Sequence, residues 1–153
     1  MRILYVITGL HKGGAEGQLL ELSGRMAKRG HTIEVITALP ASGYAEDIRA
    51  LGIPVHSLEV ELGSLNPFAI PRLAKHIWRF RPHVVHSMMV HSNLLTRVVR
   101  IISPEPVLVN TALGISESRT PEQSSRPREL AYTVTDWLAD VTLSVTDAVG
   151  DTV

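Results

Sequence analysis

Hydrophobic and polar positions follow two different periods along the chain. Continuous apolar runs of strand length recur, and stretches between them carry apolar residues at every third or fourth position, the spacing of one helix face. The runs predict strands at Ile3–Ile7, Thr32–Thr37, Val55–Leu58, His83–Ser87, Val107–Asn110 and Val141–Ser144. The helical spacing predicts helices over Glu16–Lys28, Tyr44–Ala50, Pro67 to the residue before Pro82, Asn93–Ile102 with Ser92 as its N-cap, Arg128–Leu138, and from Thr146 or Asp147 onward.

Strict alternation of strands and helices predicts an α/β fold made of βαβ units. Right-handed crossovers place helices on both faces of a mostly parallel sheet of about six strands, which gives three layers. The 153 residues suit one domain and not two full ones. One segment breaks the pattern: residues 116–127 are rich in Ser, Pro, Glu and Arg and contain no apolar residue, so we expect a mobile surface loop there, a candidate lid.

A ligand is expected at the carboxyl ends of the strands, because the crevice of a doubly wound sheet lies there. The first strand is followed by Gly9-Leu10-His11-Lys12-Gly13-Gly14-Ala15-Glu16. Gly13 and Gly14 allow the main chain to come close to a ligand, and the free amides of the first helical turn attract a phosphate or a sugar hydroxyl. A tight strand-to-helix turn explains the two glycines equally well. Glu16 lies at the same edge and is a further candidate for binding the ligand, with a carboxylate that complements the helix dipole as the alternative.

The fourth strand leads into His86-Ser87-Met88-Met89-Val90-His91-Ser92-Asn93, a second candidate site. His91 and Asn93 follow the strand and are candidates for binding a polar ligand, whereas His86, within the strand, suits a satisfied core residue. Zinc is disfavoured because the two histidines have no acidic residue or third ligand nearby, so no metal site is predicted. His91 and Glu117, the latter in the candidate lid, are the candidates for a catalytic role, with solvated side chains as the alternative.

Other function classes find little support in the sequence. The glycine spacing differs from G-x-G-x-x-G, no acidic residue ends the second strand, and no G-x-x-x-x-G-K-[ST] occurs, which argues against dinucleotide and P-loop sites. Fifteen basic and fifteen acidic side chains give zero net charge, which disfavours a nucleic-acid partner. Cysteine and G-x-S-x-G are absent, so neither a thiol nor a serine-triad nucleophile is expected.

The apolar N-terminus is too short for a membrane-spanning helix, and we expect a cytoplasmic protein. The helix before the fourth strand carries a basic face of Arg72, Lys75 and Arg79 beside Trp78 and Phe80. Such a face could rest peripherally on an anionic membrane, and a solvated helix face explains it as well.

Short segments distributed over nearly the whole chain suggest a family. They are residues 1–10 with Gly13-Gly14-Ala15-Glu16, then Arg29-Gly30-His31, Leu51-Gly52-Ile53-Pro54-Val55, Arg81-Pro82-His83-Val84-Val85-His86-Ser87, His91-Ser92-Asn93-Leu94-Leu95, and Leu138-Ala139-Asp140 followed by Val145. In this order they resemble the N-terminal domain of retaining glycosyltransferases of family 4, the group 1 type with the GT-B fold. The Gly-Gly-Ala-Glu loop and the segment of the fourth strand are the most specific.

The resemblance implies two Rossmann-like domains facing a cleft, with residues 1–153 as the acceptor-side one. The C-terminal domain of the family binds the nucleotide-sugar through two Glu separated by seven residues, a spacing found nowhere in this chain, so we expect that domain to be absent from it. The implied reaction transfers a hexosyl unit to a glycan or lipid-linked acceptor with retention and without a metal or other cofactor. Gly13 and Gly14 would approach the donor diphosphate or the acceptor, and His91 and Asn93 would line the acceptor side.

Two positions depart from the family pattern. Leu113 stands where many members have His, and Gly17 stands where Arg is frequent. The alternative is therefore a non-catalytic binding or assembly module that docks a separate donor-binding chain, and a flavodoxin-like binder of a small ligand is a third possibility. Half of a two-domain enzyme is expected to be inactive alone, and to self-associate through exposed apolar surface.

Overall fold

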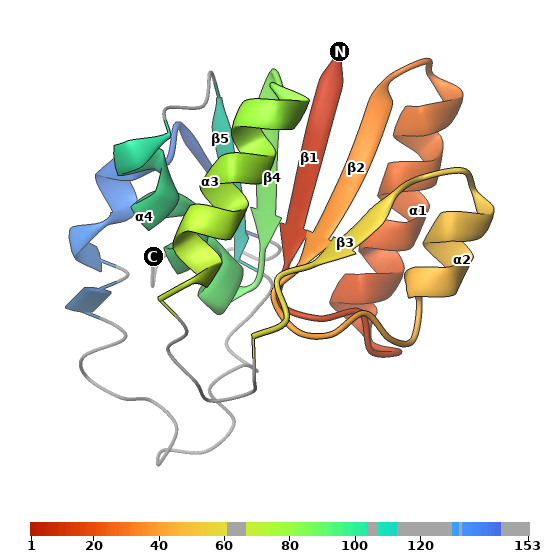
Figure 1. Ribbon diagram of the computed structural model, residues 1–153, viewed down its shortest axis with the longest axis horizontal. Coiled ribbons are helices and arrows are strands. Elements are labelled where there is room, and N and C mark those ends of the chain that lie inside the picture. Colours follow the sequence, from red (N-terminus) through yellow and green to blue (C-terminus); the bar gives the residue numbers. More distant parts are fainter. Residues whose placement is uncertain (61–66, 104–106, 113–129, 132, 145–153) are drawn as a thin grey trace.

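The computed structural model describes residues 1–60, 67–103, 107–112, 130–131 and 133–144, and its centre is a six-stranded sheet. The strands are β1 (Arg2–Ile7), β2 (Thr32–Thr37), β3 (Val55–Ser57), β4 (Val84–Met88), β5 (Leu108–Ala112) and β6 (Val141–Ser144). They lie in the order β3-β2-β1-β4-β5-β6, and every neighbouring pair is parallel (Figure 1). The predicted α/β fold with a parallel sheet of about six strands is confirmed.

Helices cover both faces of the sheet and complete three layers (Figure 1). They are α1 (Gly14–Lys28), α2 (Ala45–Ala50), α3 (Ala69–Phe80) and α4 (Val90–Ile102), with a short 3-10 helix, η2 (Asp136–Leu138). Apolar side chains of α1 and α2 pack on one face, and those of α3 and α4 pack on the other. Each strand therefore needs apolar residues on both sides, which explains the unbroken apolar runs in the sequence.

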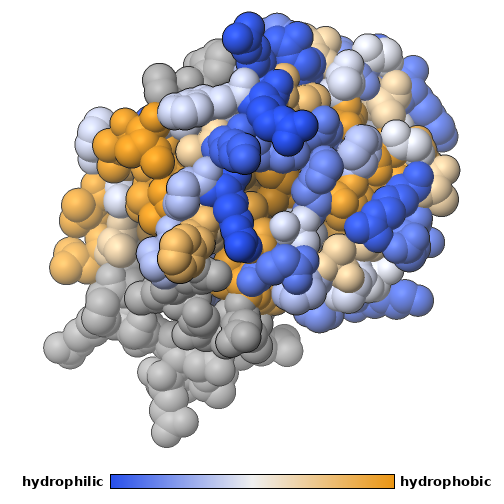
Figure 2. All heavy atoms as spheres, viewed as in Figure 1, coloured by the Kyte–Doolittle hydropathy of each residue, from blue (hydrophilic) through white to orange (hydrophobic). Residues whose placement is uncertain are grey.

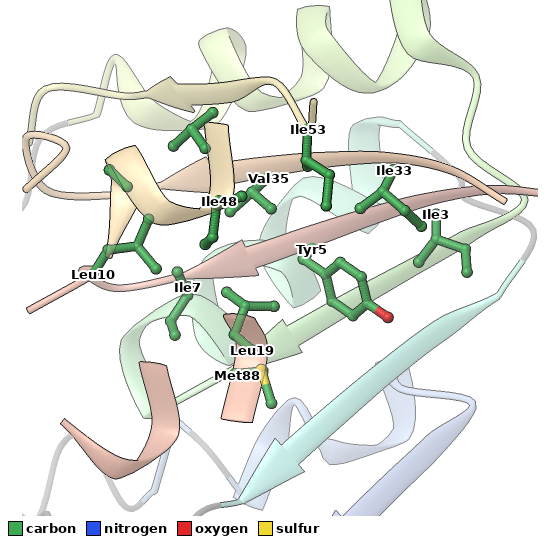
Figure 3. Close-up of a cluster of buried hydrophobic side chains, with 12 residues drawn as sticks. Ile3, Tyr5, Ile7, Leu10, Leu19, Ile33, Val35, Ile48, Ile53 and Met88 are labelled. Atoms are coloured by element: carbon green, nitrogen blue, oxygen red, sulfur yellow. The ribbon is translucent and has the colours of Figure 1, made fainter. Parts of the chain in front are cut away.

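The central strand β1 shows how one run serves two cores. Tyr5 and its neighbours two positions away face α1 and α2, together with Leu19 and Ile48 from those helices (Figure 3). Leu4 and Val6 face α3 and α4 instead. Successive strand residues point to opposite faces, so the two sets alternate along the strand.

The start of α4 differs from the prediction. The helix begins at Val90, so Ser92 is its third residue and Met89 is the N-cap. A single residue, Met89, connects β4 to α4, and its φ of 77° is a left-handed value that non-glycine residues rarely adopt. The Ser92 hydroxyl lies 3.1 Å from the hydroxyl of Thr8 and so joins α4 to the end of β1.

The C-terminal third is described only in part. Residues 130–131 and 133–134 are helical, within the range of the predicted helix over Arg128–Leu138. Residue 135 is a turn, and the 3-10 helix η2 follows it in place of the predicted end of that helix. The candidate lid at 116–127 with Glu117, the departure at Leu113 and the last predicted helix lie outside the described residues.

Large apolar side chains are exposed on α4 and on the segment that contains η2 and β6. Figure 2 shows apolar residues gathered on this side of the molecule, at the left of the view. The exposed residues here are Val98, Ile101, Ile102, Leu130, Val134, Trp137, Val141 and Leu143. Among the described helices, none has the length and apolar character needed to cross a bilayer.

Candidate functional site

The strand order reverses between β1 and β4. From β1 the sheet continues through β2 and β3 in one direction, and from β4 through β5 and β6 in the other. Chains that leave the carboxyl ends of β1 and β4 therefore diverge to opposite faces, and the gap between them is where doubly wound sheets bind ligands. The segments at this gap are the loop from Thr8 to Gly13 and the turn at Met89, each leading into a helix.

Gly13 and Gly14 place an open helix N-terminus at this switch point. Gly13 is the extended N-cap of α1, and both glycines are exposed. A Cβ atom added at Gly14 would meet nothing within 4 Å. The first bond of the helix runs from the amide of Gly17 to the carbonyl of Gly13 at 3.0 Å, so the amides of residues 14–16 precede the helical ladder. Main-chain donors of this kind suit an oxygen-rich ligand.

Glu16 folds back over this N-terminus. It is only 8% exposed, and its carboxylate lies so close to Gly13 that a side chain there would collide with it. The positive end of the helix dipole stabilises a carboxylate in this position. A diphosphate bound at the same amides would meet a like charge, whereas a sugar hydroxyl would find an acceptor in Glu16 and donors in the amides.

The loop after β2 supports the loop after β1. The amide of Tyr44 donates to the carbonyl of Leu10 at 2.8 Å, and Ser42 Oγ lies 3.4 Å from His11 Nδ1. Gly43 has a φ of 54°, and a Cβ atom there would collide with the Leu10 carbonyl oxygen. Glycine is therefore required at this crossing, which fixes the path of the chain toward Gly13.

His91 lies on the β4 side of the switch point. It is the second residue of α4 and is exposed. The strained backbone at Met89 lies two residues before it, and strain of this kind is often found at functional sites. The structure therefore places His91 and the two glycines at the starts of the two helices that flank the switch point.

Asn93 occupies a different position from the one predicted. Its side chain is fully buried, accepts a hydrogen bond from Ser87 Oγ at 2.7 Å and donates one to the Thr111 carbonyl at 3.2 Å. The prediction that Asn93 lines the acceptor side needs correction, because α4 begins three residues earlier than expected and turns this amide inward. Its role in this structure is to join α4 to β4 and β5.

The same buried polar network extends away from the switch point. Asn110 Nδ2 donates to Ser87 Oγ at 2.6 Å, and the fully buried Arg97 donates through Nε to Asn110 Oδ1, also at 2.6 Å. The Arg97 guanidinium also bonds Asp136 Oδ1 at 2.8 Å and so connects α4 to η2. A satisfied network of this kind rigidifies the helix that carries His91.

His86, predicted to be a satisfied core residue, is half-buried in β4 and has a hydrogen-bond partner. Its Nε2 atom lies 2.7 Å from Thr111 Oγ1, and its ring centroid is 5.4 Å from that of Tyr5. Burial lowers the pKa of His86 to about 4, so the imidazole is neutral at pH 7. Burial raises the pKa of Tyr5 to about 12.

A cluster with metal-binding chemistry lies elsewhere, and sequence analysis missed it. Glu34, His56 and His76 come from β2, β3 and α3, and their ligand atoms all lie within 4.8 Å of one another. Burial, followed by the charge of His76, lowers the pKa of His56. The available signal in the sequence was Glu34 itself, the one acidic residue in the run Thr32-Ile33-Glu34-Val35-Ile36-Thr37.

The basic face predicted on α3 is present. Arg72, Lys75 and Arg79 are exposed, and Trp78 beside them is 63% exposed. Phe80 instead packs against the core beneath α3. The Arg72 guanidinium donates to the Leu58 carbonyl at 2.9 Å, so part of this face is anchored to the chain after β3.

Residues 13–152 match the sequence profile of the glycosyl transferase 4-like domain. The chain belongs to this glycosyltransferase family. The match covers the switch-point glycines, helices α1 to α4 and the strands from β2 to β6, and it confirms the family predicted from the short segments.

Solved structures with the same fold include several glycosyltransferases. HepE (Alr3699) from Anabaena, in complex with UDP, has a TM-score of 0.75 and 18% identity over 99% of this chain and 40% of that chain. A glycosyltransferase from Rickettsia africae has a TM-score of 0.69 and 17% identity, over 98% of this chain and 38% of its own. WaaB, a lipopolysaccharide outer core galactosyltransferase in its apo form, has a TM-score of 0.68 and 11% identity, over 99% of this chain and 41% of its own.

These likenesses establish the fold as a Rossmann-like half of the GT-B architecture. The glycosyl transferase 4-like chain spans about two fifths of the length of these solved proteins. No curated protein matches the sequence.

Proposed function

We propose that this chain is the acceptor-side half of a retaining glycosyltransferase. The complete enzyme would transfer a hexosyl unit from a nucleotide-sugar to a glycan or lipid-linked acceptor. The donor-binding half would lie outside this chain, a proposal supported by the two fifths of neighbour length that the chain spans. Anabaena HepE has been solved with UDP-glucose, which supports a nucleotide-sugar as the donor class.

The open N-terminus of α1 at the switch point carries the proposal. Gly13 and Gly14 expose main-chain donors, and the Glu16 carboxylate beside them can accept from a hydroxyl. His91 adds an exposed imidazole on the other side of the switch point. This combination of donors and acceptors suits the hydroxyl groups of a saccharide, and the position of Glu16 favours the acceptor over the donor diphosphate as the ligand of this half.

The chemistry we assign to the complete enzyme is electrostatic. Cleavage of the bond between the sugar and the nucleotide places negative charge on the leaving diphosphate, which helix N-termini and cationic side chains stabilise without a metal. The acceptor hydroxyl, held by the switch-point residues, attacks the anomeric carbon on the face from which the diphosphate departs, and its proton passes to the departing diphosphate oxygen. Because the donor contacts are assigned to the other half, we expect the isolated chain to have no transferase activity. We expect the complete enzyme to lie in the cytoplasm, where its basic α3 face could contact a membrane.

Backbone NMR of the labelled chain tests the acceptor site. Titration with glucose and with short oligosaccharides should move the amides of residues 9–16 and 89–93, whereas UDP should leave them unchanged. His91→Ala should weaken the saccharide response, and His31→Ala, a change at the opposite edge of the sheet, should not. Saccharide shifts confined to other residues, or transfer of glucose from UDP-glucose by the isolated chain at an enzyme-like rate, would contradict the proposal.

One observation favours a second function. Leu113 stands where many family members have His, and leucine can neither take a proton nor bond a sugar. The alternative is a non-catalytic module that docks a separate donor-binding chain. The variant Leu113→His restores the family residue, and assaying it in the assembled enzyme distinguishes the two functions. Transferase activity already present with Leu113 supports the transferase. Activity that is absent both before and after the change supports the non-catalytic module.

A further inference from the structure

We propose that Glu34, His56 and His76 form a binding site for a divalent transition metal of the zinc type, at the β3 edge of the sheet. Ile36 pairs with His56 in the β2–β3 register, and Glu34 lies two residues before Ile36 on the same face. That face is the one covered by α3, because Ile36 belongs to the core beneath α3. The side chain of His76, on α3, contacts Glu34 of this pair, so three separate elements contribute one ligand each.

The distances from the two imidazoles to the Glu34 carboxylate fit a metal with a small adjustment. Both imidazoles direct Nε2 at the same carboxylate oxygen, at 2.6 Å for His76 and 3.6 Å for His56. Tetrahedral zinc with bonds of about 2.0–2.1 Å requires ligand atoms about 3.3 Å apart. The His56 distance already has this value within a few tenths of an ångström, and the His76 ring needs to withdraw by less than 1 Å.

The ligand set and its surroundings define the class of metal. Two imidazole nitrogens and one carboxylate suit zinc and its neighbours among the divalent transition metals, and are poor ligands for magnesium or calcium. The Glu34 and His76 side chains are 21% exposed and His56 is 47% exposed, so an ion can enter from the edge of the sheet and keep water in the fourth position. Arg49 and Arg79 are close enough to affect His56 electrostatically and oppose a cation, so we expect affinity well below that of a four-ligand structural site.

The site would tie α3 and the edge strand β3 to the interior strand β2. It lies on β2 and β3, outside the switch point between β1 and β4, so it is independent of the proposed transfer reaction. A bound ion would fix α3, the helix with the basic face Arg72, Lys75 and Arg79, against the sheet. Stabilisation by a ligand that binds only the folded state grows with the ligand concentration.

Metal titration of the purified 153-residue chain tests the inference. Zinc competition with a chromophoric chelator should give one ion per chain, and Co²⁺ should produce visible absorption of a four-coordinate complex. His56→Gln changes the most exposed ligand and should weaken zinc binding at least tenfold while leaving the circular dichroism unchanged. The control His31→Gln removes a histidine outside the cluster and should bind zinc as the unmodified chain does.

Two results would overturn the inference. One is zinc binding that His56→Gln leaves unchanged, because the ion would then lie elsewhere. The other is the absence of stoichiometric binding to the unmodified, folded chain, which would leave Glu34 and His76 as a hydrogen-bonded pair. Neither result bears on the saccharide site, whose NMR test uses different residues.

Discussion

Acid should destabilise the fold through one half-buried histidine, His86. In the unfolded chain this imidazole has its ordinary pKa of 6.5, and burial in the folded protein lowers the pKa to about 4. Between these two values the unfolded state binds the proton and the folded state resists it. The contribution of His86 to stability is therefore complete above pH 6.5 and is lost as the pH falls toward 4.

The size of the effect follows from the same two values. At about 1.4 kcal/mol for each pKa unit, protonation of His86 should remove roughly 3 kcal/mol from the free energy of unfolding by pH 4, and about 2 kcal/mol of this is lost by pH 5. Such a loss is a large part of the free energy of unfolding of a small domain, which is roughly 5–15 kcal/mol.

Urea unfolding at pH 7.5 and pH 5 measures this loss, and a variant isolates the residue. His86→Gln does not titrate, although its amide can still bond Thr111 Oγ1, so its stability should fall by about 2 kcal/mol less over this range. The control His91→Gln changes an exposed histidine and should keep the full pH dependence. Equal pH dependence in the unmodified chain and His86→Gln, or an NMR titration of His86 near pH 6.5, would refute the reasoning.

Three further changes test other parts of the structure. Gly43→Ala should lower the free energy of unfolding by about 1–3 kcal/mol, because the new Cβ atom collides with the Leu10 carbonyl at a positive φ. Gly14→Ala has open space around it and should lower the free energy of unfolding by less than about 1 kcal/mol. Equal urea midpoints for the two variants would contradict this. Asn93→Ala should destabilise by about 2 kcal/mol in thermal unfolding, because two buried partners lose their bonds, and an unchanged melting temperature would argue against its structural role. Trp137 is 79% exposed and lies on the apolar surface that we expect to drive self-association. Trp137→Glu should therefore shift the sedimentation of concentrated protein toward the monomer. A strict monomer in the unmodified protein would contradict the expectation.

The main features of the fold were predictable because they depend on local periodicity. The apolar run in β1 and the one-sided apolar stripe of α1 identify a strand covered on two faces and a helix covered on one, and alternation of such elements permits few sheet topologies. The place of Gly13 and Gly14 followed directly, because the position of a residue after a strand determines the edge of the sheet at which it lies.

The environment of individual side chains was less predictable. The spacing after β4 gave no sign that Met89 would turn the chain in one residue, so α4 begins earlier than expected and Asn93 points inward. The sequence also places Glu34, His56 and His76 far apart, and only the register of β2 with β3 and the packing of α3 bring them together.

Sequence alone thus determined the family, the parallel sheet and the edge that carries the switch-point glycines, since each depends on short-range patterns of residues. Tertiary structure decided which polar side chains face solvent and which face one another. The physical reason is that burial, ion pairing and metal-ligand distances depend on contacts between residues far apart in the chain, and these contacts exist only once the layers have packed.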